Sequence, residues 1–267
     1  MANKRLALIG CGHLGQIVAE AYRKELLPGY ELVGVLGRDP ARAEALAAEA
    51  GCIVCPDLDA LLALKPDFVV ECASVKAVRD YALPILRSGA ELILLSIGAL
   101  AAPAFRAEAE TAAVAGNTHL HLASGAIGGF DVLTTVSLMA LAAGEPLTAG
   151  IHTHKGPKSL ENTPVYLPQL SMDTDERTVF TGNAVEAISL LPTKVNVAVA
   201  ASLATAGPEN TTVQITSVPG FVGDDHRIEA KCGGVTAITD IYSSTSDIAA
   251  WSAVALLRNL SSPIQFH

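Results

Sequence analysis

The stretch LALIGCGHLG, residues 6–15, decides the fold of the first half of this chain. An apolar strand runs into three glycines spaced as G-x-G-x-x-G, and a helical pattern follows. Gly10 permits a tight turn, Gly12 lets the backbone approach a pyrophosphate, and Gly15 allows the helix to lie close to the strand. Free N–H groups at the helix start would face the phosphate charge. We therefore expect a dinucleotide to contact Gly10, Gly12, His13, Leu14 and Gly15.

Strands and helices alternate through the rest of the first half. The predicted strands cover residues 6–10, 31–37, 67–73, 91–97 and 118–123, and the predicted helices cover 13–26, 40–50, 75–88 and 103–115. Continuous apolar strands separated by helices are typical of a parallel sheet covered on both faces. The pattern predicts an α/β fold, a doubly wound Rossmann domain over residues 1–123.

The pattern changes in the second half, where polar and apolar residues alternate along the strands. Alternating strands are predicted at 147–155, 211–218, 226–232 and 235–242, and helices at 184–191 and 194–206. Such strands favour a mainly antiparallel sheet with one covered face, which predicts an α+β domain over residues 124–243. A last helix, within about 244–267, is apolar enough to pack back on the first domain.

Composition excludes several classes of protein. Half of the 267 residues are hydrophobic and 17% are charged, which is typical of a globular protein with one or two large cores. A net charge of −9 without a basic run argues against nucleic acid as a partner. The apolar runs are too short to span a membrane, no signal peptide is recognisable, and five scattered cysteines suit a reducing compartment. We expect a cytoplasmic protein.

The ends of two predicted strands bear on the cofactor. A turn selective for NAD carries Asp or Glu after the second strand, whereas this chain has Leu-Gly-Arg at 36–38. Arg38 can bind a 2′-phosphate or stack on adenine, so NADP is expected to be accepted, with NAD also possible; a solvated loop arginine is the alternative. Cys72, Ala73 and Ser74 end a later strand at the ligand-binding edge, where small side chains admit the nicotinamide ribose, although Ser74 also fits a helix cap.

A second glycine turn, SGAIGGFDVL at 124–133, lies where the two predicted domains join. Together with FTGNAVEAISLLPTKVNVAVAASLA at 180–204 and DHRI at 225–228, it resembles the L-aspartate dehydrogenase family in order and spacing. The resemblance covers most of the chain. It implies a Rossmann domain followed by a catalytic domain, oxidation of aspartate to iminoaspartate, and a homodimer formed through the second domain.

The resemblance also implies roles for single residues. Ala126 and Asn196 would contact the nicotinamide end of the cofactor, and His226 would be the catalytic histidine. These residue types suit the roles, since an amide both donates and accepts, and imidazole exchanges protons near neutral pH. A surface histidine at a strand start is the alternative for His226. Backbone donors at Ser124 and Gly125, together with the residues His154 and Lys155, would hold the substrate carboxylates; a solvated lysine is the alternative for Lys155.

Departures from the family pattern fall in the substrate region. The chain has His-Lys-Gly-Pro at 154–157 where the family usually carries a K-P-P-like stretch, and DIYSSTSDIAAWS at 240–252 replaces an N-P-K-T-S region. Two other functions stay open: a dehydrogenase of the same architecture for another amino or hydroxy acid, and a non-catalytic NAD(P)-binding sensor. The pathway, NAD synthesis or aspartate breakdown, stays open as well.

Two histidine pairs alternate along predicted strands, His119 with His121 and His152 with His154. Such pairs can bind metals, but no Cys, Asp or Glu at suitable spacing in the sequence completes either set. Cys52 and Cys55 form a C-x2-C without a second pair. We therefore expect no metal site.

Overall fold

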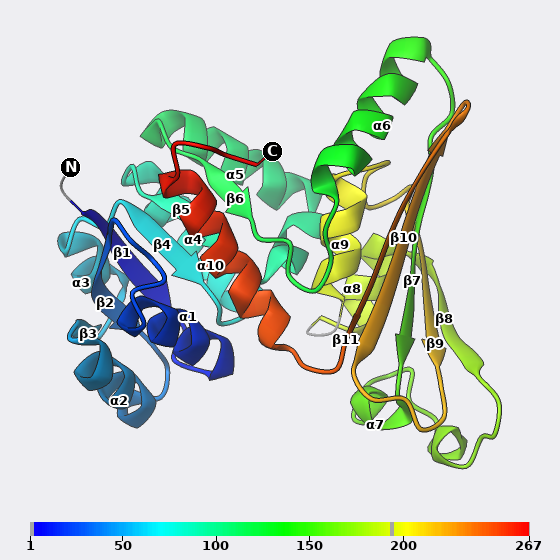
Figure 1. The fold of residues 1–267 in the computed structure, drawn as a ribbon, viewed down its shortest axis with the longest axis horizontal. Coiled ribbons are helices and arrows are strands. Elements are labelled where there is room, and N and C mark those ends of the chain that lie inside the picture. The colour runs from blue at the N-terminus through cyan, green and yellow to red at the C-terminus, as the bar shows by residue number, and fades with distance from the viewer. Residues whose placement is uncertain (1–2, 193–194, 267) are drawn as a thin grey trace. The chain divides into compact units, whose positions relative to one another are not determined.

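The computed structural model describes residues 3–192 and 195–266 and divides them into two compact units. The first unit runs to Gly125 and resumes at Asp247, and the second is Ala126–Ser246. Each unit has its own sheet (Figure 1). The chain thus passes from one unit to the other within the second glycine turn.

The first unit is built on a six-stranded parallel sheet in the order β3-β2-β1-β4-β5-β6. Its strands are β1 (Lys4–Ile9), β2 (Tyr30–Leu36), β3 (Ile53–Cys55), β4 (Phe68–Glu71), β5 (Glu91–Leu94) and β6 (Leu120–Leu122). Its helices are α1 (His13–Arg23), α2 (Pro40–Ala50), α3 (Leu58–Ala63), α4 (Val75–Arg87), η1 (Ile97–Ala101), α5 (Pro103–Gly116) and α10 (Asp247–Ser261). This strand order, with helices on both faces, confirms the predicted doubly wound fold (Figure 1).

Helix ends follow the signals in the sequence. The Asp39 carboxylate accepts a hydrogen bond from the Arg42 N–H at 3.2 Å, and Gly51 ends α2 in the left-handed region. The Ser74 hydroxyl accepts from the Ala77 N–H at 3.1 Å at the start of α4. These caps satisfy N–H groups that lack partners within the helix, so the strand ends preceding α2 and α4 are fixed in place.

Helix α10 completes the core of the first unit although it comes last in the chain. Its residues Ala253 and Leu257 are buried in the same apolar cluster as Leu8 of β1 and Ile93 of β5. The Tyr30 hydroxyl donates to the Leu257 carbonyl at 2.8 Å. The first unit is therefore discontinuous in sequence.

The second unit has a five-stranded sheet in the order β11-β10-β7-β9-β8. Its strands are β7 (Thr148–Lys155), β8 (Arg177–Asn183), β9 (Thr212–Ser217), β10 (Asp224–Cys232) and β11 (Val235–Ser243), and its helices are α6 (Phe130–Ala143), α7 (Pro157–Leu160), η2 (Pro168–Ser171), α8 (Ala184–Leu190) and α9 (Asn196–Leu203). The pairing is antiparallel except between β7 and β9, which run parallel. Parallel neighbours need a long connection, and residues 156–211 supply it. Lys194, where the second helix was expected to begin, lies outside the described residues.

Alternation along β7 separates the two faces of the second sheet. Thr153 and Lys155 are buried, whereas His152 and His154 are half-buried on the other face. Helices α6 and α9 pack against β10 and β7 (Figure 1). Because successive side chains point to opposite faces, this register decides which polar groups face the helix-covered side.

Helix α6 leaves several large apolar side chains exposed. Leu138 is 59% exposed, Met139 45% and Leu141 79%. Of the described helices, none is long and apolar enough to cross a bilayer.

Candidate active site

In the first glycine turn, two glycines are needed for packing of the backbone, and the third borders open space where a ligand could lie. A Cβ on Gly10, whose φ is +114°, would lie 2.7 Å from the Cys72 carbonyl oxygen, and one on Gly15 would lie 2.1 Å from that of Gly10. A Cβ on Gly12 would meet nothing within 4 Å. Gly10 and Gly15 are therefore required by the fold, whereas the bare backbone at Gly12 borders open space, as a pyrophosphate cradle requires.

The start of α1 presents backbone N–H groups. Gly12 precedes the helix and gives it no side-chain cap. The side chains of the next two residues are engaged, since His13 Nε2 lies 2.6 Å from Asp247 Oδ1 and Leu14 packs against the core. Contact of these two residues with a dinucleotide therefore falls to their N–H groups, which favour an anion at a helix N-terminus.

A buried carboxylate organises the neighbouring strand end. Glu71 is 2% exposed and closes β4. Its carboxylate accepts hydrogen bonds from the N–H groups of Ala73 at 2.7 Å, Ser74 at 2.8 Å and Ser96 at 3.0 Å, and from the Ser96 hydroxyl at 2.9 Å. Burial raises the pKa of Glu71, against the opposing effect of these hydrogen bonds. Glu71 therefore fixes the backbone of residues 71–74.

The other predicted cofactor residues surround this edge of the sheet. Cys72 is buried, with its Sγ 3.5 Å from the Gly10 carbonyl oxygen, and burial raises the pKa of its thiol. Ala73 is exposed, and Ser74 caps α4 as well as lying at the edge. Arg38 is exposed after β2. Small residues thus follow the end of β4, and the exposed Arg38 follows the end of β2.

The second unit buries a histidine beside a lysine. His226 on β10 is directly opposite Thr153 on β7, and its Nδ1 makes a 2.9 Å hydrogen bond with Thr153 Oγ1. Two residues along, Lys155 lies opposite Asp224, with 2.6 Å between Nζ and Oδ1. His226 is 2% exposed and Lys155 3%. Directly opposed residues share a face, so all four groups lie on the helix-covered side.

The environment keeps His226 neutral. Burial, and then the Lys155 ammonium, lower the pKa of His226 to about 4, against the opposing effect of Asp224. A neutral imidazole held at Nδ1 can accept a proton at Nε2. This is the ionisation state that a general base needs near neutral pH.

A hydroxyl without a partner lies beside this group. Ser217 on β9 pairs in register with Lys155, is 2% exposed, and its Oγ has no hydrogen-bond partner among the described residues. Buried hydroxyls normally find a partner, because leaving one unpaired costs about 1–3 kcal/mol. The Ser217 hydroxyl is therefore suited to bind a polar ligand next to the lysine.

The structure separates His154 from these groups. Its side chain lies on the opposite face of the sheet, 3.5 Å from Asp225 and with its ring centroid 4.2 Å from that of His152. The cause is the two-residue period of a strand, which cannot place both His154 and Lys155 on one face. His154 therefore does not join the buried histidine and lysine.

The remaining predicted residues lie in the loop between β6 and α6 and at the start of α9. In the second glycine turn, Gly125 donates its N–H to the Ser252 hydroxyl at 2.9 Å, so this donor is already engaged, while Ser124 and Ala126 are half-buried. Asn196 is the first residue of α9, the helix that packs against β7. Asn196 therefore opens a helix on the covered face of the second sheet.

The first unit is a dinucleotide-binding domain. The second unit carries a buried base next to a cation. Together these features define the class of nicotinamide-dependent oxidoreductases. A family model for the NAD-binding domain of homoserine dehydrogenase matches residues 10–123, and one for the C-terminal domain of aspartate dehydrogenase matches 136–260. The chain belongs to the L-aspartate dehydrogenase family.

Three relatives support this membership. The chain is 31% identical to an L-aspartate dehydrogenase of Methanococcus maripaludis, covering 98% of both chains. It is 37% identical to one of Ruegeria pomeroyi, over 85% of this chain and 79% of that one. The crystal structure of aspartate dehydrogenase from Thermotoga maritima matches 99% of this chain and 100% of that one with a TM-score of 0.79 at 26% identity.

Sequence reasoning missed Glu71, Thr153 and Ser217. A carboxylate inside the apolar run DFVVECA was a usable signal, because a buried charge needs partners. Because side chains alternate along a strand, Thr153 lies on the same face as Lys155, and this could be predicted once residues 148–155 were recognised as a strand. The position of Ser217 next to Lys155 depends on the pairing of β7 with β9, and no local sequence pattern predicts that pairing.

A pair of glycine variants tests the first turn. Gly12→Ala should keep stability within about 1 kcal/mol of the parent, because its φ of −78° suits alanine and its Cβ meets open space, yet weaken NAD(P)H binding about tenfold or more. Gly15→Ala should destabilise the protein by about 1–3 kcal/mol, because its Cβ overlaps a carbonyl. Fluorescence titration and urea unfolding measure both, and unchanged binding by Gly12→Ala would contradict the cradle.

The buried histidine should make stability depend on pH. Between about pH 6.5 and 4 the unfolded chain binds a proton at His226 that the folded chain does not, so stability falls as pH falls, by about 3 kcal/mol over that window. His226→Asn should remove this part of the slope while keeping a hydrogen-bonding atom toward Thr153. Urea unfolding between pH 4.5 and 7.5 measures it.

The matched control is His152→Asn. Burial, and then His154, lower the pKa of His152 as well, but this histidine is only partly buried, so the control should change the slope less. Equal slopes in the parent and His226→Asn would show that His226 does not titrate as described.

Proposed function

We propose that this protein catalyses the reversible NAD(P)-dependent oxidation of L-aspartate to iminoaspartate, which water then converts to oxaloacetate and ammonia. The observation that carries the proposal is the buried neutral imidazole of His226 next to the Lys155 ammonium, in a chain 31% identical over 98% of its length to an L-aspartate dehydrogenase. The first unit supplies the cofactor and the second supplies the acid–base chemistry.

On the cofactor side, the open backbone at Gly12 and the N–H groups of His13 and Leu14 would hold the pyrophosphate, in a tight turn that Gly10 and Gly15 make possible. Cys72, Ala73 and Ser74, fixed by Glu71, line the ribose, and Arg38 allows a 2′-phosphate, so that NADP is accepted besides NAD. The bound nicotinamide supplies a hydride acceptor for the Cα hydrogen of the substrate. By the family resemblance, Ala126 and Asn196 would contact that end of the cofactor.

On the substrate side, His226 takes the proton that the amine loses as the C–N bond becomes an imine. When Nδ1 carries the ring proton and donates it to the Thr153 hydroxyl, Nε2 is the nitrogen that accepts. In the hydrolytic step the same nitrogen takes a proton from the attacking water. The low pKa of His226 favours release of each proton to solvent, which closes the cycle.

A dicarboxylic substrate needs cations and donors for two carboxylates. Lys155 provides a buried cation shared with Asp224, and the unpartnered Ser217 hydroxyl lies beside it. The Gly125 N–H is bonded to the Ser252 hydroxyl, so within the predicted pair of turn residues only Ser124 stays a candidate contact for the substrate. A charged pair in a buried setting interacts strongly enough to distinguish aspartate from a monocarboxylic amino acid.

Absorbance of the reduced nicotinamide tests the proposal. Purified protein with NAD or NADP should turn over aspartate, and His226→Asn should lower kcat about 100-fold or more, because general-base catalysis is lost. Ser217→Ala should raise KM for aspartate several-fold with a smaller change in kcat, because it removes a ligand contact. His152→Asn, on the other face of the same sheet, is the control and should retain activity.

The other outcomes of this assay are informative. Turnover only with other amino or hydroxy acids would replace aspartate by another substrate, as the departures at 154–157 and 240–252 allow. Cofactor binding without turnover across such a panel would identify a sensor and end the proposal.

We propose further that the protein works as a cytoplasmic homodimer with a small-molecule substrate and no nucleic acid. All five cysteines are free thiols, as a reducing compartment permits. Leu138, Met139 and Leu141 form an exposed apolar stretch of α6 in the second unit, which favours an interface with a second copy.

Sedimentation equilibrium at micromolar concentration tests the homodimer. The parent should sediment at twice its chain mass of 27.6 kDa, and Leu141→Glu should shift it to one chain mass, because a charge would be buried in the interface. Leu141 is 79% exposed, so the change does not disturb the fold of the chain. Val114→Glu, at an 82% exposed site on α5, is the control. A monomeric parent would refute the dimer.

A further inference from the structure

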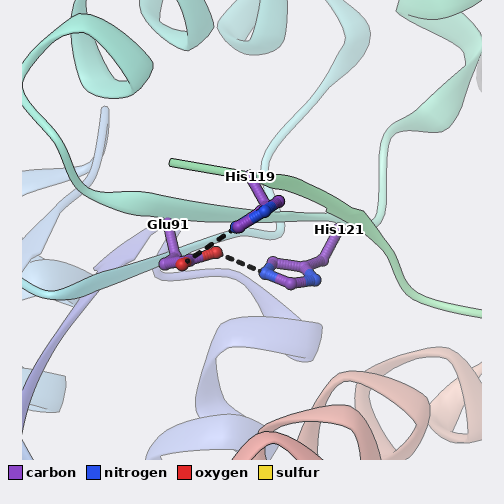
Figure 2. A group of neighbouring side chains, drawn as sticks. All are labelled: Glu91, His119 and His121. Carbon is purple, nitrogen blue, oxygen red and sulfur yellow. Dashed lines mark hydrogen bonds and ion pairs between the residues drawn. The ribbon is translucent and has the colours of Figure 1, made fainter. Parts of the chain in front are cut away.

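Three metal-ligating side chains gather on one face of the first sheet. His119 lies just before β6, His121 lies within it, and Glu91 opens the neighbouring strand β5. The strands pair in parallel with Ile93 opposite His121, so Glu91 lies two residues before Ile93 on the same face. Figure 2 shows both imidazoles directed at the Glu91 carboxylate.

The donor atoms are close enough for one ion. His121 Nε2 lies 2.5 Å from Glu91 Oε2, His119 Nδ1 lies 3.3 Å from Glu91 Oε1, and one donor atom from each of the three residues lies within 4.8 Å of the others. Donor atoms around a tetrahedral zinc ion are about 3.3 Å apart, given bonds of about 2.0–2.1 Å. The distance from His119 Nδ1 to Glu91 Oε1 already matches that spacing, and the shorter contact between His121 Nε2 and Glu91 Oε2 must open by about 0.8 Å to admit an ion.

The sequence predicted no metal site because no Cys, Asp or Glu lies at suitable sequence spacing from either histidine pair. For His119 and His121, the fold supplies a carboxylate from a different strand. Glu91 is 28 residues away from His119 in sequence, and only the β5–β6 pairing brings it close. In the described part of the chain, this is the only set of three or more such residues found with its donor atoms this close. The second pair, His152 and His154, belongs to no such set.

We propose that Glu91, His119 and His121 bind a divalent transition-metal ion of the zinc type. Two imidazole nitrogens and one carboxylate oxygen favour zinc, cobalt or nickel over magnesium or calcium, which prefer all-oxygen sites. Water completes the coordination. Glu91 and His119 lie at the amino end of the parallel strands, whereas Gly10 and Cys72 lie at the carboxyl end, so the ion is structural, joining edge strand β6 to β5.

Cobalt titration of the apo protein tests the site directly, because a bound cobalt ion has visible d–d absorption and can be displaced by zinc. The parent should bind one cobalt or zinc ion per chain with micromolar affinity, and saturating zinc should raise Tm by about 5 °C. His121→Gln and Glu91→Gln should each weaken binding about 30-fold or more and remove the absorption.

A third ligand variant, a control variant and a control measurement separate this site from surface binding. His119→Gln, at an exposed position that cannot disturb the fold, should weaken binding as the other ligand variants do. His152→Asn, in the second histidine pair, should leave binding unchanged. NADP affinity measured without metal should be the same in the parent and His121→Gln. Failure of the parent to bind one ion at 100 µM metal, or equal binding by the parent and His121→Gln, would overturn the proposal.

Discussion

The pairing of β10 with β7 is the constraint on which the chemistry of the second unit depends. It sets Thr153 opposite His226 and Lys155 opposite Asp224, so a base, its orienting hydroxyl and a cation share one covered face. A slip of one residue would move His226 to the opposite face, away from Thr153 and Lys155. The apolar partners farther along the same strands, Ile151 with Ile228, stabilise this register by burial.

A second constraint acts in the first unit, where backbone approaches backbone. Gly10 and Gly15 bring β1, α1 and the end of β4 so close that no side chain fits, and Glu71 draws three N–H groups and a hydroxyl around its carboxylate. A buried carboxylate with four donors rigidifies a loop at the cost of desolvation. Contacts within the protein therefore fix the conformation of the glycine turn at 10–15 and of the loop after β4, without a bound ligand.

Local patterns predicted much of this molecule because its strongest signals are local. The glycine spacing at 10–15, the cap at Ser74 and the period of two in β7 each depend on residues a few positions apart, and the structure bears them out. Contacts that depend on which strands are neighbours in the sheet could not be predicted from the sequence. The parallel pairing of β7 with β9, which places Ser217 beside Lys155, and the approach of Glu91 to His119 both join residues far apart in sequence.

The discontinuity of the first unit has a consequence for synthesis of the chain. Helix α10 contributes Ala250, Ala253, Val254 and Leu257 to a core whose other members occur before residue 124. While a ribosome is still translating the middle of the message, that apolar surface stays uncovered, and the second unit emerges in full before the first can close. Nascent chains therefore carry exposed apolar surface, of the kind that chaperones shield, while the whole of Ala126–Ser246 is being synthesised.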